Sequence, residues 1–150
     1  MSEYHKQTTT FNDEECLVKA LVDIGYSREQ IEVHKDAVAL VDYVGRQTHY
    51  TDSNGDKANV IIRRQHLGYR AGNDVGFKWN VETKSYDAMI SEYDSSAAHW
   101  GAEGSRFKKL KTQYSEHRSM KQAKKMGFRF LGKKVVNGKV QLQFVDPRVG

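Results

Sequence analysis

The positively charged residues after position 104 are the side chains whose type and spacing point most directly to a chemical role. Residues 105–134 hold eleven Lys or Arg residues and a single acid, Glu116. Cations at this density attract an anionic partner, and nucleic acid is the first candidate. We expect the phosphate contacts to come from Lys108, Lys109, Lys111, Lys121, Lys124, Lys125 and Arg129. The alternative is a solvated basic face that only aids solubility.

Two carboxylates suggest a second kind of chemistry. Asp74, followed by the run Glu82-Thr83-Lys84, matches the D…E-x-K pattern in which two carboxylates hold Mg²⁺ and a lysine assists the attacking water. Three residues at such spacing are common by chance, and the run from Glu82 to Lys84 falls on an expected hairpin turn. A metal-dependent nuclease therefore ranks below the other hypotheses.

Other catalytic or cofactor motifs are absent from the sequence. The six histidines form no H-x-x-x-H pair, no P-loop sequence occurs, and the one cysteine, Cys16, lies in an expected apolar helix as a small buried side chain. We therefore expect no catalytic residues, no metal, no cofactor and no small-molecule substrate, and a non-enzymatic role is the leading hypothesis.

The cations need a scaffold, and the periodicity of residues 105–127 predicts two short helices. Two apolar stripes at helical spacing would pack inward and leave the lysines in water. The stripes are Phe107, Leu110 and Tyr114 in the first helix, and Met120, Ala123 and Met126 in the second. Ser119 with Gln122 is a capping-box pattern for the second helix, and Gly127 is placed to end it.

The remaining elements predict an α+β fold, with an antiparallel sheet of hairpins and helices packed on one face. A helix starts at Asn12 and stops at Gly25, and strands are expected over 75–81 and 85–93. A final hairpin turns at Asn137-Gly138. Its strand alternation separates Phe130 from Arg129, and we expect Phe130 to pack in the core rather than to stack on bases of a single strand. The predicted order is β-α-β-β-β-β-α-α-β-β, and because strands cluster rather than alternate with helices, the sheet is antiparallel.

Composition and charge restrict the class of protein. A chain of 150 residues with 38% hydrophobic and 29% charged residues suits a single folded domain, 1–150, with its basic helices and hairpin at 105–145. Residues 1–100 carry 11 basic and 16 acidic residues, whereas residues 101–150 carry 13 and 3, which predicts one basic pole. With no membrane span, no signal peptide and one cysteine, we expect a cytoplasmic location.

Several short motifs, in this order and spacing, resemble the Ycf-thirty-five family, a plastid and cyanobacterial conserved reading frame also common in tailed phages. The motif residues are Tyr43, Gly45, Gln47, Gly76, Phe77, Tyr114 and Gly127. The resemblance covers most of residues 5–130 and implies a compact α+β fold, but no activity, since the family has no settled biochemistry. It also makes a phage origin, and thus the host cytoplasm, an expectation. The lysines after Ser105 depart from the family pattern.

Three hypotheses for function follow. The first is a non-enzymatic accessory protein that binds nucleic acid through a basic helical face. The second is an adaptor or inhibitor that binds an acidic protein partner, which complementary charge would favour; the presence of an AAA-type ATPase beside some family members points the same way. The third is the nuclease that uses Asp74 and Glu82.

Overall fold

Five antiparallel strands form the main sheet of the protein, and a two-stranded hairpin follows towards its C-terminal end. The computed structural model describes residues 4–41, 56–68, 72–97 and 99–148. In chain order the helices and strands are β1 (Tyr4–Thr8), α1 (Glu14–Asp23), β2 (Ile31–Ala39), β3 (Lys57–Ile62), β4 (Val75–Asn80), β5 (Ser85–Ser91), α2 (Glu92–Ala97), α3 (Ser105–Lys125), β6 (Arg129–Val136) and β7 (Lys139–Val145). Short 3-10 turns at Arg28–Gln30 and Arg64–His66 precede β2 and follow β3.

The strand order of the main sheet is β1-β5-β4-β3-β2, which confirms the predicted α+β class. Strands β2 to β5 form a meander, because each pairs with the next along the chain. Strand β1 instead pairs with β5, with Tyr4 opposite Ser91. The N-terminal strand thus adds to the edge formed by a strand about 80 residues later.

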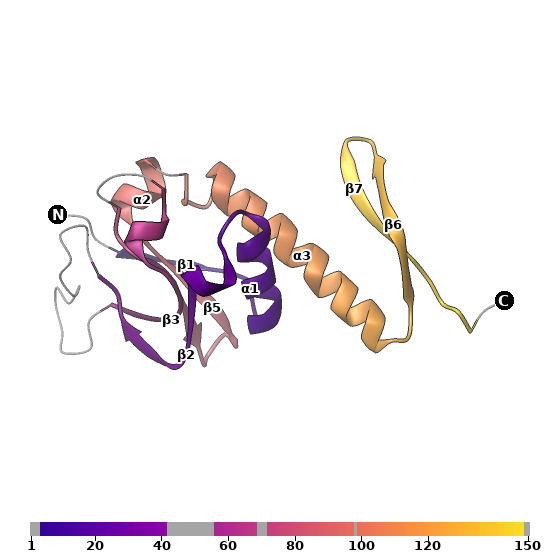
Figure 1. Ribbon diagram of the computed structural model, residues 1–150, viewed down its shortest axis with the longest axis horizontal. Coiled ribbons are helices and arrows are strands. Elements are labelled where there is room, and N and C mark those ends of the chain that lie inside the picture. The colour runs from indigo at the N-terminus through magenta and orange to yellow at the C-terminus, as the bar shows by residue number, and fades with distance from the viewer. Residues whose placement is uncertain (1–3, 42–55, 69–71, 98, 149–150) are drawn as a thin grey trace.

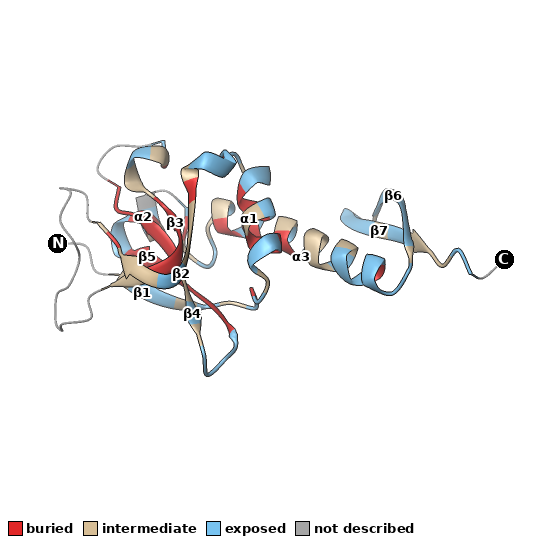
Figure 2. Cartoon of the chain, turned by 60° about the horizontal axis from the view of Figure 1, so that its bottom comes forward, coloured by how far each residue is buried: buried red, intermediate tan, exposed pale blue. Residues whose placement is uncertain are grey.

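Helices α1 and α3 cover one face of this sheet, and the main core lies between the helices and the sheet (Figure 1, Figure 2). Phe11 is at its centre, with ring centroids 4.6 Å from Tyr114 and 6.2 Å from both Phe77 and Phe107. Phe77 lies opposite Ala88 in the β4–β5 pair, on the face that strand alternation predicted. Tightly packed aromatic rings therefore join the sheet to α3.

Helix α1 begins one residue later than predicted. Asp13, not Asn12, is its N-cap, and the Asp13 side chain accepts a hydrogen bond from the Cys16 amide at 2.9 Å. Asn12 is engaged elsewhere, because its amide donates to the Tyr114 hydroxyl at 2.8 Å and its side-chain oxygen accepts from that hydroxyl at 3.0 Å. Gly25, with φ +122°, follows the end of the helix as expected, and Cys16 is buried.

The predicted pair of basic helices is wrong: residues 105–125 form the single helix α3. Ser119 and Gln122 lie inside it, so their capping-box pattern is not used. No Gly or Pro interrupts residues 105–126, and most of these residues favour a helix interior, so the helix continues. It ends at Gly127, as predicted, where φ is +83° and the Phe128 amide donates to the Ala123 carbonyl at 2.8 Å.

Helix α3 leads away from the sheet to the β6–β7 hairpin (Figure 1). Its first stripe, which includes Phe107 and Leu110, is buried as predicted. In the second stripe Ala123 is buried, but Met126 is 51% exposed, contrary to prediction, because this end of α3 extends beyond the sheet (Figure 1). The expectation that Phe130 packs in the core is also wrong, since it is 39% exposed.

Candidate nucleic-acid interface

The predicted phosphate-binding residues do not share one side of α3. Successive residues of an α-helix are turned by about 100°, so Lys108 and Lys109 point in clearly different directions. Lys121 points towards α1, where its ammonium group lies 2.7 Å from the Asp13 carboxylate. The cations that the sequence grouped together are therefore spread around the helix.

Three of these lysines already have partners. The hydrogen bond from Lys121 to Asp13 raises the pKa of the lysine. Burial alone would raise the pKa of Asp13, but hydrogen bonds from Lys121 and from the backbone of α1 outweigh it and lower that pKa. Lys108 lies 3.8 Å from Glu103, and Lys111 donates to a backbone carbonyl at 3.4 Å. These side chains are less available for phosphate than exposure alone suggests.

The other four predicted residues make no ion pair with any described residue: Lys109, Lys124, Lys125 and Arg129. Three of the four lie where α3 ends and β6 begins. The available positive charge is therefore concentrated at the distal end of α3, next to the hairpin.

One of the two faces of the β6–β7 hairpin is also positively charged. Asn137 and Gly138, with φ of +51° and +76°, make the predicted two-residue turn. Directly opposed residues share a face, and Lys139, Gln141, Gln143 and Val145 of β7 oppose Val136, Lys134, Gly132 and Arg129 of β6. This basic face thus carries three cations and two amides, and it carries no carboxylate.

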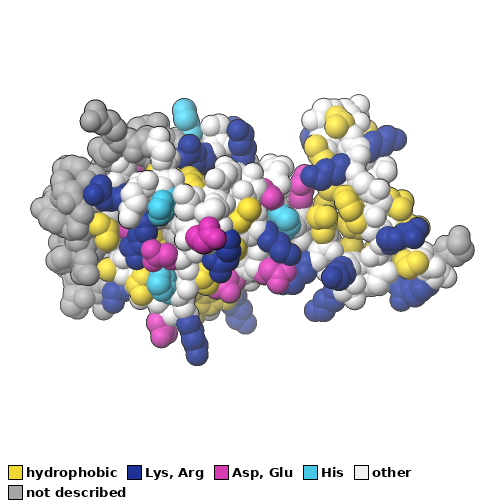
Figure 3. Space-filling view, viewed as in Figure 1, with side chains coloured by type: hydrophobic (Ala, Val, Ile, Leu, Met, Phe, Trp, Pro, Cys, Tyr) yellow, Lys and Arg dark blue, Asp and Glu magenta, His cyan; other side chains and the backbone are white. Residues whose placement is uncertain are grey.

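The opposite, apolar face of the hairpin is incompletely covered. Val140, Leu142 and Phe144 oppose Val135, Lys133 and Phe130, and the two phenylalanine rings lie 5.5 Å apart. Val135 is 70% exposed and Val140 52%. Figure 3 shows hydrophobic side chains gathered on the hairpin among its Lys and Arg residues.

Lys134 and Lys139 were not among the residues singled out from the sequence. The signal that identifies them is the alternation of polar and apolar residues in the run KVQLQFV of β7, together with the Asn-Gly turn that sets the register. The same alternation predicts both the basic and the apolar face.

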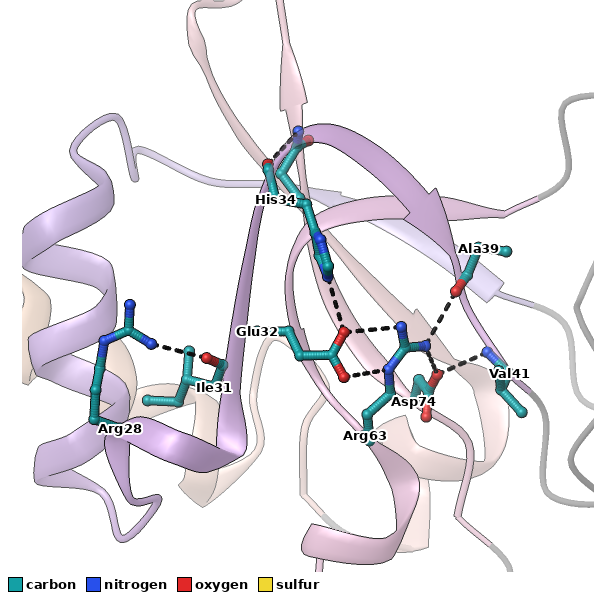
Figure 4. Close-up of polar contacts among 9 residues, drawn as sticks. Arg28, Ile31, Glu32, His34, Ala39, Val41, Arg63 and Asp74 are labelled. Atoms are coloured by element: carbon teal, nitrogen blue, oxygen red, sulfur yellow. Dashed lines mark hydrogen bonds and ion pairs between the residues drawn. The ribbon is translucent and has the colours of Figure 1, made fainter.

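Asp74 belongs to a buried network that ties β2 and β3 to the start of β4 (Figure 4). Its carboxylate is fully buried and accepts hydrogen bonds at 2.7 Å each from the Arg63 guanidinium and from the amides of Val41 and Arg64. Arg63 also holds Glu32 by two hydrogen bonds of 2.7 and 2.9 Å, which chiefly lower the pKa of that glutamate. The charge on Asp74 is thus neutralised within the fold.

The two carboxylates of the nuclease hypothesis are not brought together. Asp74 precedes β4 and Glu82 follows it on an exposed turn, so the length of the strand, roughly 20 Å, separates them. Among the described residues no three His, Cys, Asp or Glu side chains are grouped to hold a metal ion. The structure therefore offers no support for two-carboxylate metal chemistry at this pair.

Four of the family-motif residues have structural roles. A Cβ atom on Gly76 would lie 2.5 Å from the Ala58 Cβ, so only glycine fits there, while Phe77 is buried in the main core. The Tyr114 hydroxyl fixes the segment before α1, and Gly127 ends α3. The other three, Tyr43, Gly45 and Gln47, lie outside the described residues.

The fold and surface define a small α+β protein with a basic, two-faced hairpin carried on a long helix. The chain belongs to the family described as "Protein of unknown function (DUF1257)", whose model matches residues 20–142. No curated protein and no solved structure matches the chain. No helix in the described part of the chain is long and apolar enough to cross a membrane.

Proposed function

We propose that this protein is a non-enzymatic accessory protein that binds nucleic acid through the basic face of the β6–β7 hairpin and the adjoining end of α3. The observation that carries the proposal is the arrangement of Arg129, Lys134 and Lys139 on one hairpin face without an ion-pair partner among the described residues. Lys124 and Lys125 extend the same charge onto α3. We therefore assign the nucleic-acid contacts chiefly to the hairpin rather than to the helical face that the sequence predicted.

The geometry suits a nucleic-acid duplex. A two-stranded β-ribbon is narrow enough to enter the major groove of B-DNA, where cations contact phosphates and amide side chains reach base edges. Gln141 and Gln143 lie between the cations on this face and supply such amides. Because binding through cations releases counterions, affinity should fall steeply as salt rises.

Fluorescence anisotropy with a labelled duplex, over a salt series of roughly 50 to 400 mM, tests the proposal. The variant Arg129→Gln, Lys134→Gln, Lys139→Gln should reduce the salt slope by up to about 3, since each lost phosphate contact contributes about 0.9. The matched control replaces three exposed lysines of the main sheet and its turns by glutamine: Lys6, Lys35 and Lys84. Equal effects of the two triple variants would show that only net charge matters.

A third variant separates the hairpin from the helical face predicted from the sequence. Replacing Lys108, Lys109 and Lys111 by glutamine removes the same charge from the proximal half of α3. We expect a smaller loss of affinity than for the hairpin variant. Absence of binding to duplex and to single strands at low salt would refute the proposal. Closer kinship to the Ycf-thirty-five family, phage origin and cytoplasmic location are parts of the same proposal.

A further inference from the structure

A groove separates α3 from the hairpin. It has a volume of about 820 Å³ and is lined on the helix side by polar residues, which include Thr112, Ser115 and Ser119. Glu116 also lines it, and its carboxylate is paired with Lys133. The opposite wall is formed by the apolar face of β7, with Val140 and Leu142. An apolar wall thus faces a polar one, and the hairpin does not close onto the helix.

The hairpin is held to α3 by few interactions. Lys133 and Glu116 form an ion pair at 2.8 Å, and the Lys133 side chain is half exposed. Such a pair contributes little to stability. An isolated two-stranded hairpin is marginally stable in water, and exposed apolar patches on soluble proteins commonly mark interaction sites. The apolar face of the hairpin therefore gains most from a partner that covers it.

The positive charge around the groove indicates that the partner is negatively charged. Residues 104–145 contain 12 cations and one acid, and Lys111 and Lys139 line the groove itself. A second copy of the chain would bring two such basic regions together, which like-charge repulsion opposes. Nucleic acid complements the charge but not the apolar wall. A helix with an apolar stripe and acidic flanks complements both.

We propose that the groove between α3 and the apolar face of the β6–β7 hairpin is a docking site for an acidic amphipathic helix of another protein. The apolar stripe of the helix would cover Val140, Leu142 and Phe144, and its acidic flanks would lie beside Lys111 and Lys139. Lys139 is common to this site and to the proposed nucleic-acid site, because it lines the groove and also lies on the basic face. The other residues differ: Arg129 and Lys134 belong only to the basic face, and Val140, Leu142 and Phe144 only to the apolar face.

Selection from a random peptide library of about 18 residues, long enough for five helical turns, tests the site on the nuclease-treated, full-length protein. We expect enrichment of apolar residues at i, i+3, i+4 and i+7 flanked by Asp or Glu. An enriched peptide is then synthesised, and its affinity is measured with the variant Val135→Glu, Val140→Glu. That affinity should fall by about tenfold or more.

The matched control is Val22→Glu, Val81→Glu. It places the same two charges on exposed valines of the main body, whose exposed fractions are 43% and 76%. The variant Val135→Ser, Val140→Ser removes only apolar surface and should also weaken binding, with circular dichroism unchanged.

Two results with the peptides would overturn the proposal: selected peptides that lack the apolar stripe, or equal weakening of binding by the control variant. It would also be overturned if duplex DNA occupies the groove instead, or if sedimentation shows that a second copy of the chain covers the hairpin.

Discussion

The hairpin should be dispensable for folding, and a chain that ends at Phe128 tests this directly. No residue after Ala123 is among the buried core residues that the structure describes, so truncation exposes little apolar surface. It removes the Lys133–Glu116 ion pair and a hydrogen bond from Arg148 to the Met126 carbonyl. The Phe128 amide still caps α3, because its bond to the Ala123 carbonyl is kept.

The magnitude follows from these few losses. An exposed ion pair contributes about 0–1 kcal/mol, an exposed hydrogen bond about 0.5–1 kcal/mol, and the new carboxylate near the C-terminus of α3 costs about 0.3–1 kcal/mol. We therefore expect the free energy of unfolding to fall by about 1–3 kcal/mol and Tm, at about 2–4 °C per kcal/mol for a chain of this size, by roughly 2–12 °C. Phe11→Ala, at the centre of the core, should cost about 3–5 kcal/mol in the full chain.

The assay is thermal and urea unfolding, followed by circular dichroism, of the full chain, the truncated chain and Phe11→Ala. A loss on truncation as large as that of Phe11→Ala would refute the reasoning, because the hairpin would then be part of the cooperative core. A small loss, combined with lost binding, would place the hairpin's contribution in function rather than in folding.

Three further predictions concern the main sheet, each measured as a urea-unfolding midpoint. Arg63→Ala leaves the buried carboxylate of Asp74 unpaired and should cost about 3–5 kcal/mol, whereas a purely catalytic role for that carboxylate predicts little loss. The pKa of Glu32 is lowered chiefly by Arg63, so its stabilisation is present above the unfolded pKa near 4.3 and is lost as pH falls through the folded value. Glu32→Gln should therefore cost about 0.5–1 kcal/mol at neutral pH, a small value because the side chain is partly exposed, and the cost should shrink as pH falls below the unfolded pKa. Gly76→Ala should cost about 1–3 kcal/mol by overpacking, and Ala58→Gly in the same chain should recover much of that loss; additive costs would contradict the close contact.

Local sequence signals predicted the elements whose geometry is set by neighbouring residues. The Asn137-Gly138 turn determines the last hairpin because both residues tolerate positive φ, and Gly127 ends α3 for the same reason. The β4–β5 hairpin follows from strand alternation. These features depend on a few adjacent residues, so the sequence is sufficient to predict them.

The same local signals do not predict how elements far apart in the chain are placed relative to one another. The capping pattern at Ser119 and Gln122 can also occur inside a helix, and here the helix-favouring residues around it keep the helix continuous. The pairing of β1 with β5 joins segments about 80 residues apart, for which turn chemistry gives no information. The position of Met126 depends on where α3 leads, which the helical period alone does not specify.

The hairpin shows why a correct local pattern can predict the wrong environment. Its alternation separates polar from apolar side chains as in any half-buried sheet, and burial in the core was the natural expectation for Phe130. The length of α3 instead carries the hairpin beyond the sheet, so the apolar face meets water or a partner rather than the core (Figure 1). A strand pattern that would stabilise a core thereby becomes a surface with one basic face and one incompletely covered apolar face. The lysine variants change only the basic face and the valine variants only the apolar face, so the two faces can be tested by different substitutions.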